Sequence, residues 1–161
     1  MAIELRPNCA YALIAPTSIG VRITPVERQP VHCSDTFVMQ ATSAESNAAS
    51  VCSYLGLRVK LLTKFVKDSP IARFIKDNLA SRHMDYEGAE VDQGGPWGYR
   101  HQMNIADSGY GSRGPRVHND RAGEVGRGLS ARDFDLEQIF GTDGAQVMHL
   151  SGLIAALSPE T

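Results

Sequence analysis

Two consecutive segments decide the fold: TSAESNAASVCSYLG at residues 42–56 and RVKLLTKFV at residues 58–66. In the first segment, apolar residues recur at intervals of three and four, the spacing that lines one face of a helix: Ala48, Val51, Cys52 and Leu55. We predict that Thr42 and Glu45 form a capping box at the start of this helix and that Gly56 closes it. The second segment is almost continuously apolar, which predicts a buried strand.

The flanking segments continue this alternation of strands and helices. AYALIAP at residues 10–16 is short, apolar and stopped by proline, which is typical of a buried first strand. Asp68 or Ser69 can cap a second helix that has Pro70 in its first turn. VMHLSGL at residues 147–153 then predicts another buried strand. Together these elements predict an α/β domain with a parallel sheet and right-handed crossovers.

Two polar segments interrupt the α/β pattern. Residues 25–38 hold two prolines and alternating polar residues, which favour an exposed flap. Residues 94–128 are rich in glycine and arginine, and their strand-like pieces, at about 97–106 and 116–119, predict an extended hairpin. The G-x-G-x-x-G spacing at residues 109–114 lacks the following helix of a dinucleotide site, so it is interpreted as a hairpin tip.

Composition excludes several classes of function. The chain has 161 residues, is 42% hydrophobic and carries a net charge of −2, which fits one globular domain and indicates neither nucleic acid nor an anionic membrane as partner. Its apolar runs are far shorter than the roughly 20 residues of a membrane span. Neither a Walker phosphate loop nor a His/Cys spacing typical of zinc is present. Three scattered cysteines and no secretory signal predict the cytoplasm.

Asn47 and Arg121 are candidate ligand residues. Asn47 lies near the start of the first predicted helix, and Arg121 follows the second hairpin strand. An asparagine amide can donate to and accept from a hydroxyl, and a guanidinium can hold a carboxylate with two parallel hydrogen bonds. Both residue types suit a sugar acid. Each is also a common solvated or capping residue, so these two residues alone leave a structural role open.

Residues 42–56 resemble the segment GGAEANVAVALARLG of ribokinase-type (PfkB-family) carbohydrate kinases, most closely the 2-keto-3-deoxygluconate kinases. Six residues stand in register with that segment: Ala44, Glu45, Asn47, Ala49, Leu55 and Gly56. Further segments resemble the family in the same order along the chain: VRITP at 21–25, KFVKDSPIARFI at 64–75, VHNDRAGEV at 117–125 and HLSGLIAALSP at 149–159.

The resemblance implies the N-terminal part of a ribokinase-like three-layer α/β/α fold with a small β-sheet lid, formed by residues at about 20–40 and 94–120. It implies ATP-dependent phosphorylation of a sugar or sugar acid such as 2-keto-3-deoxygluconate, with Mg²⁺ as the companion of ATP. The family's G-A-G-D segment, which supplies the anion hole and the catalytic base, has no counterpart. We therefore expect residues 1–161 to be the N-terminal portion, without the ATP-binding half, without catalytic residues or cofactor and metal sites, and inactive alone.

The resemblance also assigns site residues. Asn47 and Arg121 occupy sugar-contacting positions, and the full set of predicted substrate-binding residues is Asn47, Arg121, Thr42, Ser43 and Ser18. The sequence departs from the family at some of these. Thr42 and Ser43 stand in place of a Gly-Gly pair, Thr17 and Ser18 in place of Gly-Glu, and Asn119 in place of a tyrosine.

Two other functions stay open at this level. The chain could be a non-catalytic sugar-binding or regulatory relative that kept the fold and lost the glycine pair, or a fragment that dimerises through the lid. A homodimer formed through the lid is also compatible with the kinase interpretation. Which sugar is bound is not fixed by residue spacing, because hydroxyl stereochemistry depends on the positions of side chains.

Overall fold

The main sheet has four parallel strands in the order β5–β4–β1–β8 in the computed structural model, which describes residues 4–161. The strands are β1 (Tyr11–Pro16), β4 (Val59–Val66), β5 (Asp85–Val91) and β8 (Ala145–Met148). Central strand β1 pairs in parallel with β4 and with β8. The predicted parallel α/β sheet is therefore confirmed.

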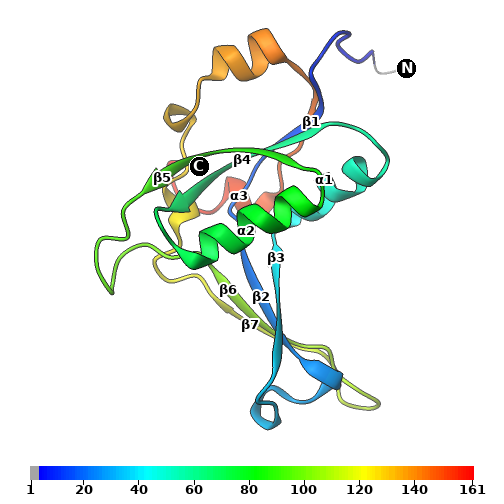
Figure 1. Ribbon diagram of the computed structural model, residues 1–161, viewed down its shortest axis with the longest axis vertical. Helices are drawn as coiled ribbons and strands as arrows, with labels where there is room; N and C mark the ends of the chain where they lie inside the picture. Colours follow the sequence, from blue (N-terminus) through cyan, green and yellow to red (C-terminus); the bar gives the residue numbers. More distant parts are fainter. Residues whose placement is uncertain (1–3) are drawn as a thin grey trace.

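Helices α1 (Ala44–Tyr54) and α2 (Pro70–Ser81) lie together against one face of the main sheet (Figure 1). Both helices were predicted, but the apolar face predicted for α1 is wrong: Val51 and Leu55 are 61% and 73% exposed, and the buried residues of α1 are Glu45, Ser46 and Ala49. Ile75 and Leu79 of α2 are fully buried in the same core cluster as Leu61 and Phe65 of β4. Burying an aliphatic or aromatic side chain of this size contributes about 1.5–3 kcal/mol, so this interface is a main source of stability.

The capping box predicted at Thr42 and Glu45 is wrong by one residue. Ser43 is the N-cap of α1: its hydroxyl accepts from the Ser46 N–H at 2.9 Å, and the Ser46 hydroxyl accepts from the Ser43 N–H at 3.0 Å. Thr42 is instead the last residue of β3 (Phe37–Thr42), where it pairs with Gly20. Pairing between strands therefore sets where the helix begins, and the Glu45 side chain is left for other contacts.

A second, mixed sheet extends away from the main sheet (Figure 1). Its strand order is β3–β2–β6–β7, with β2 (Gly20–Pro25), β6 (Met103–Asp107) and β7 (Arg116–Asp120). Strands β6 and β7 form the predicted hairpin, although β6 begins six residues later than expected and Trp97 is 97% exposed. Short turns η1 (Val26–Arg28) and η2 (Val31–Cys33) connect β2 to β3. We call this four-stranded sheet the lid sheet.

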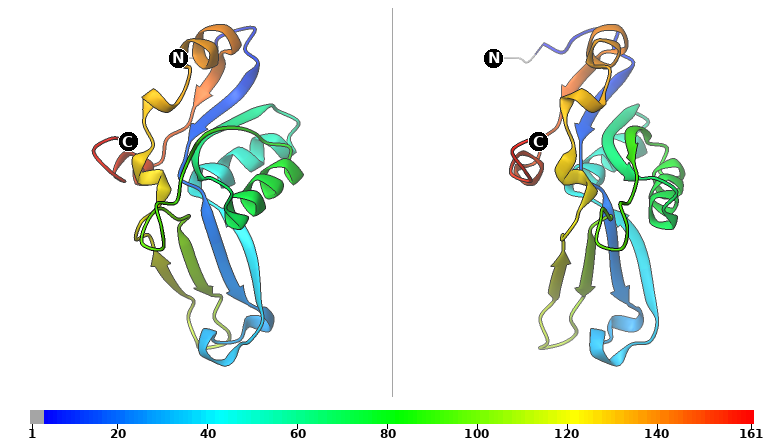
Figure 2. Two further views of the ribbon diagram at one scale, coloured as in Figure 1. Left: turned by 60° about the vertical axis from the view of Figure 1, so that its left-hand side comes forward. Right: turned by 90° about the vertical axis from the view of Figure 1, so that its left-hand side faces the viewer.

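The opposite face of the main sheet carries short helical turns, which Figure 2 shows across the sheet from α1 and α2. They are η3 (Val125–Gly128), η4 (Ala131–Asp133), η5 (Glu137–Asp143) and α3 (Gly152–Ala155). The buried strand predicted at residues 147–153 is wrong: β8 ends at Met148 and α3 begins at Gly152. Within the described chain β8 is an edge strand that pairs only with β1, so Val147 and Met148 are 43% and 50% exposed.

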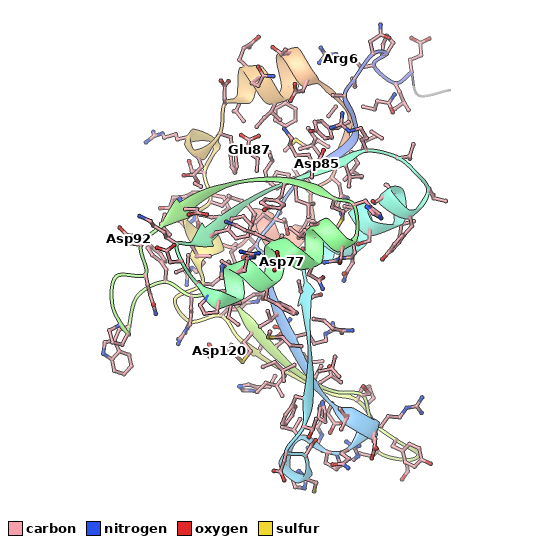
Figure 3. All side chains as sticks on the ribbon, viewed as in Figure 1. Arg6, Asp77, Asp85, Glu87, Asp92 and Asp120 are labelled. Carbon is pink, nitrogen blue, oxygen red and sulfur yellow. The ribbon has the colours of Figure 1, made fainter. Side chains whose placement is uncertain are left out.

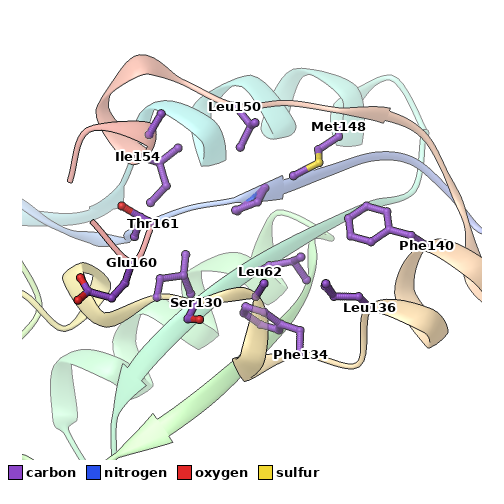
Figure 4. A pocket seen from close by; sticks show the side chains of 14 residues that line it. Leu62, Ser130, Phe134, Leu136, Phe140, Met148, Leu150, Ile154, Glu160 and Thr161 are labelled. Carbon is purple, nitrogen blue, oxygen red and sulfur yellow. The ribbon is translucent and has the colours of Figure 1, made fainter. Parts of the chain in front are cut away.

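An apolar cavity of about 270 Å³ lies on this second face (Figure 4). Leu62, Phe134, Phe140, Met148 and Ile154 are among the side chains that line it. None of the helices described in residues 4–161 combines the length and apolarity needed to cross a bilayer. Cys9, Cys33 and Cys52 are all free thiols.

Candidate functional site

Residues 17–19 join β1 of the main sheet to β2 of the lid sheet. The N-terminus of α1 and the segment after β7 also reach this junction, through the hydrogen bonds described below. It lies at the carboxyl end of a parallel strand, the edge where open α/β sheets bind their ligands. The junction of the two sheets is therefore the candidate site.

A buried carboxylate organises one side of the junction. Glu45 is only 2% exposed, and its Oε2 lies 2.7 Å from the hydroxyl oxygen of Thr17. The Thr17 oxygen is also 2.8 Å from the Ser43 hydroxyl. Because a carboxylate only accepts, the single Thr17 proton goes to Glu45 and Ser43 donates to Thr17. The Ser151 hydroxyl donates to the other oxygen of Glu45, so this side chain ties α1 to β1 and to the start of α3.

A second buried carboxylate organises the other side. Glu124 is 1% exposed, and Arg121 Nη1 donates to both of its oxygens at 3.0 Å. The Ser18 hydroxyl donates to Glu124 Oε1. Gly126 packs directly on Ser18, since a Cβ at residue 126 would lie 2.0 Å from the Ser18 oxygen. The structure thus brings the predicted residues Ser18 and Arg121 together through a carboxylate that the sequence analysis did not identify.

The other predicted residues lie around the start of α1. Thr42 and Ser43 are 8% and 7% exposed. Asn47 is exposed in the first turn of the helix, where its backbone N–H donates to the Ser43 carbonyl. Its side chain makes no hydrogen bond to any group in residues 4–161, and none joins it to Arg121. Figure 3 shows Asp120, the residue before Arg121, on the lid sheet and apart from Asp85 and Glu87 of β5.

Glu124, Glu45 and Ser151 are the site residues that sequence reasoning missed. Glu124 lies within the segment VHNDRAGEV that resembles the family, but the sequence analysis assigned no role to its side chain. Glu45 was assigned to the cap. Its actual partner Ser151 is 106 residues away in the sequence, so no local pattern reports that contact.

His101 fixes the base of the lid sheet to the main sheet. Its Nδ1 is 3.0 Å from the Ile19 carbonyl oxygen, and its Nε2 accepts from the Val66 N–H at 3.4 Å. Since a carbonyl needs a donor and an N–H needs an acceptor, the ring is neutral with its proton on Nδ1. Burial lowers the pKa of His101, and the hydrogen bond to the Ile19 carbonyl partly opposes this shift. The neutral ring therefore holds the end of β4 and the β1–β2 connection together.

The junction is chemically suited to hydroxyl and carboxylate groups rather than to a nucleotide. Within the described chain, no three His, Cys, Asp or Glu side chains gather where they could hold a metal ion. Two carboxylates, Glu45 and Glu124, are buried at the junction, and the guanidinium of Arg121 is already paired with Glu124. ATP and Mg²⁺ are implied by the family resemblance, but this balance of charge does not fit a triphosphate. The apolar cavity of Figure 4 contains none of the predicted site residues.

A parallel sheet whose first strand leads directly into a small mixed sheet is the N-terminal arrangement of ribokinase-like sugar kinases. The particular likeness is to PfkB-family carbohydrate kinases, including a 2-dehydro-3-deoxygluconokinase from Thermotoga maritima. That structure superposes with a TM-score of 0.81 and 25% identity, over 92% of this chain and 43% of that one. The predicted resemblance is therefore confirmed at the level of structure.

Two further solved structures extend the likeness. A PfkB-family carbohydrate kinase from Listeria grayi gives a TM-score of 0.79 and 24% identity, over 91% of this chain and 43% of that one. An uncharacterized sugar kinase from Pyrococcus horikoshii in complex with ATP gives 0.71 and 16%, over 92% and 45%. The chain thus spans less than half the length of these kinases. No protein-family model and no curated protein matches its sequence.

Proposed function

We propose that this chain is the sugar-binding portion of an ATP-dependent carbohydrate kinase that phosphorylates a sugar or a sugar acid resembling 2-keto-3-deoxygluconate. The observation that carries the proposal is the junction itself. There, the hydroxyls of Thr17, Ser18 and Ser43 and the guanidinium of Arg121 are held in place by two buried carboxylates. Groups held in fixed positions bind a ligand without the entropic cost of ordering them.

Arg121 is proposed to hold the carboxylate of a sugar acid. Its Nη1 is engaged by Glu124, while its Nε and Nη2 make no hydrogen bond within residues 4–161. Those two donors point from one edge of the guanidinium plane and match the two oxygens of a carboxylate. Glu124 is then a positioning residue, because it fixes the guanidinium and leaves that edge free.

Asn47 is proposed to bind a sugar hydroxyl. Its amide is exposed in the first turn of α1, an 11-residue helix, and can both donate and accept. The positive end of the helix dipole adds a modest preference for negative charge on the ligand. Thr42 and Ser43 make the space at the start of α1 smaller, because the family has glycine, without a side chain, at both positions.

The phosphoryl donor in this proposal is ATP with Mg²⁺, as in the family. A similar sugar kinase, from Pyrococcus horikoshii, was solved with ATP, which supports this choice. We assign no catalytic base, cofactor-binding residue or metal ligand within residues 1–161, so we expect the 161-residue chain alone neither to bind ATP nor to transfer phosphate. The three free thiols support a cytoplasmic location.

Thermal unfolding with a panel of sugars tests the proposal. A ligand that binds only the folded chain raises the Tm in proportion to the logarithm of its concentration over Kd. We expect 2-keto-3-deoxygluconate to raise the Tm more than ribose or fructose, and Arg121→Ala to remove that difference. An unchanged Tm with all three sugars, at concentrations up to tens of millimolar, contradicts the proposal.

A non-catalytic sugar-binding or regulatory relative is the second candidate. It is favoured by one observation: Thr42 and Ser43 fill, with buried side chains, positions where the family keeps open glycine backbone. Both candidates predict sugar binding. They differ in turnover, which is measurable in a longer form of the protein that includes a G-A-G-D segment.

We also propose that the lid sheet forms a homodimer contact. Val38 and Val117, which the strand register places on the same face of this sheet, are 49% and 58% exposed. Sedimentation velocity at increasing concentration tests this. A second, heavier species that Val117→Lys removes is expected, and a purely monomeric profile at high concentration contradicts the contact.

A further inference from the structure

A pocket of about 670 Å³ lies at the far end of the lid sheet from the junction. Figure 1 shows the connection between β2 and β3 and the tip of the β6–β7 hairpin together at this end. The turn η2 in that connection packs against β6, and residues of η2, β6 and β7 line the pocket. Four nitrogen-bearing side chains are among them: Arg113, Arg116, His32 and His118. We call it the lid-tip pocket.

The register of the lid sheet gathers these side chains on one face. Arg116 and His118 of β7 pair with Asp107 and Ile105 of β6, and paired residues project to the same face of a sheet. Arg121 of the junction lies five residues beyond Arg116, about 17 Å along an extended chain. The lid-tip pocket is therefore separate from the junction, and its ligand can bind whether or not the junction holds a sugar.

The carboxylate of Asp107 in the lid-tip pocket is already paired. Asp107 is 8% exposed, accepts from the Gly109 N–H at 2.9 Å and forms an ion pair with Arg113. The hydrogen bond from Arg113 is the main cause that lowers the pKa of Asp107, so the carboxylate stays ionised and cancels the charge of Arg113. Arg113 also donates through Nη2 to the Arg28 carbonyl at 2.7 Å. This pair fixes the shape of the pocket and leaves its net charge to the other side chains.

One arginine and two histidines of the lid-tip pocket have no partner. Arg116, His32 and His118 are exposed, and their side chains form neither a hydrogen bond nor a salt bridge within residues 4–161. A metal ion does not suit them, because a guanidinium repels a cation and the described chain holds no cluster of metal-ligating side chains. A phosphate monoester carries a charge of about −1.5 to −2 at pH 7 and has three terminal oxygens. It matches one guanidinium and two imidazole donors.

We propose that the lid-tip pocket binds a soluble phosphate monoester. Its phosphate contacts Arg116, His32 and His118, and the apolar part of the ligand packs on Ile105 and Pro30, which line the same pocket. Inorganic phosphate lacks that apolar part, so it leaves these two side chains in water and binds more weakly. Because His32 belongs to η2 and Arg116 to β7, the bound ligand joins these two elements.

The test compares three probes that carry both parts of the ligand or only one. Phenyl phosphate has a phosphate and an apolar ring, inorganic phosphate has no ring, and benzyl alcohol has no phosphate. The 161-residue chain is titrated with each by NMR, as wild type and as Arg116→Gln and His118→Gln. Arg22→Gln is the matched control, because Arg22 is an exposed arginine without a salt bridge within residues 4–161. It pairs with Asn104, the neighbour of Ile105, and so projects to the other face of the lid sheet.

We expect phenyl phosphate to shift the amide signals of η2 and β7 and to bind more tightly than inorganic phosphate or benzyl alcohol. Arg116→Gln should weaken phenyl phosphate binding about tenfold, the effect of losing one hydrogen bond to a charged group. His118→Gln should also weaken it, and Arg22→Gln should leave it unchanged. Both pocket variants should keep the Tm of the wild type, because Arg116 and His118 are exposed and unpaired within the described chain.

Four results contradict a phosphate ester site at the lid tip. The first is no binding of phenyl phosphate by the wild type at concentrations up to tens of millimolar. The second is unchanged affinity in both Arg116→Gln and His118→Gln, and the third is an equal loss in Arg22→Gln, which indicates general attraction by charge. The fourth is binding to vesicles that contain phosphatidic acid without binding of phenyl phosphate, because the ligand is then a lipid headgroup and not a soluble ester.

Discussion

Arg121 Nη1 lies 3.0 Å from each carboxylate oxygen of the fully buried Glu124. This ion pair connects the end of the lid strand β7 to the turn η3 on the main-sheet side. Because Glu124 also accepts from Ser18, the pair spans the junction between the two sheets. Arg121 therefore supports the fold as well as offering donors to a ligand, and its substitution has two separable effects.

The first effect is on stability. We expect Arg121→Ala to lower the free energy of unfolding by about 2 kcal/mol, because it leaves the buried Glu124 carboxylate without a counter-charge; partial solvation of the arginine keeps the loss below the 3–5 kcal/mol of fully buried pairs. Urea unfolding of Arg121→Ala, Glu124→Ala and the double variant measures the coupling. A coupling of at least about 1 kcal/mol is expected. Additive losses contradict a direct interaction.

The second effect is on the ligand. Arg121→Ala should weaken sugar-acid binding by about 1.5–3 kcal/mol, the usual value of a hydrogen bond to a charged group, and spare neutral sugars. Calorimetry at a temperature where both chains are folded checks this. Arg116→Ala is the control, because Arg116 is an exposed arginine of the preceding strand β7 that forms no salt bridge within residues 4–161. Equal losses in both arginine variants contradict a specific role for Arg121.

Ser43 and Thr42 should differ in their effect on stability. Ser43→Ala removes the N-cap of α1 and the contact with Thr17, so a loss of about 1–2 kcal/mol is expected. Thr42→Ala leaves the cap in place and should cost less. Chemical denaturation of the two variants distinguishes them. If Thr42→Ala lowers the free energy of unfolding more than Ser43→Ala does, the N-cap is Thr42, as the sequence predicted.

Glycine at both positions should widen the choice of sugar. Thr42→Gly with Ser43→Gly removes two buried side chains from the junction, and a β-branched threonine restricts the backbone more than glycine does. We expect the double variant to bind more of the three sugars 2-keto-3-deoxygluconate, fructose and ribose than the wild type does. Identical binding profiles indicate that the two side chains point away from the sugar.

His101 should make stability depend on pH. Its pKa in the folded chain is lowered by burial, while an unfolded histidine has a pKa near 6.5. The unfolded chain therefore binds more protons in the interval between these values. The contribution of the neutral His101 ring to the free energy of unfolding is fully present above about pH 6.5 and is lost as the pH falls through the pKa of the folded chain. The free energy of unfolding changes by at most about 1.4 kcal/mol per pH unit from this one group.

Denaturation from pH 5 to pH 8 checks this expectation, with His101→Phe as the comparison. In His101→Phe, the free energy of unfolding should depend less on pH, because the contribution of His101 is gone. His118→Phe alters an exposed histidine of β7 and should keep the pH dependence of the wild type. Parallel curves for wild type and His101→Phe would mean that folding leaves the pKa of His101 unchanged, contrary to its burial.

Local patterns predicted most of the elements. Apolar spacing located α2 and β4, whose apolar side chains are buried in one core cluster. It also located α1, but Val51 and Leu55 of the face predicted for that helix are 61% and 73% exposed. The same criterion failed at β8, since an apolar run does not reveal how many strands will pair with it. The position of the helix cap was also predicted wrongly. The patterns T-x-x-E at residues 42–45 and S-x-x-S at residues 43–46 overlap, and the pairing of Thr42 with Gly20 leaves Ser43 as the N-cap.

The site was less predictable, because its contacts join distant parts of the chain. Family resemblance supplied Ser18, Ser43 and Arg121, and the structure places them in two hydrogen-bonded groups. The carboxylates that hold those groups were not identified. The lid sheet also depends on the register between β2 and β6, which are about 80 residues apart in the sequence, and no local pattern sets that register.

The most direct test of the central claim is calorimetric titration of the 161-residue chain, with 2-keto-3-deoxygluconate and separately with Mg-ATP. If this chain is the sugar-binding portion of a carbohydrate kinase, the sugar acid gives a saturable heat that Arg121→Ala reduces at least tenfold, and Mg-ATP gives none. Micromolar binding of Mg-ATP together with no binding of the sugar acid would contradict it.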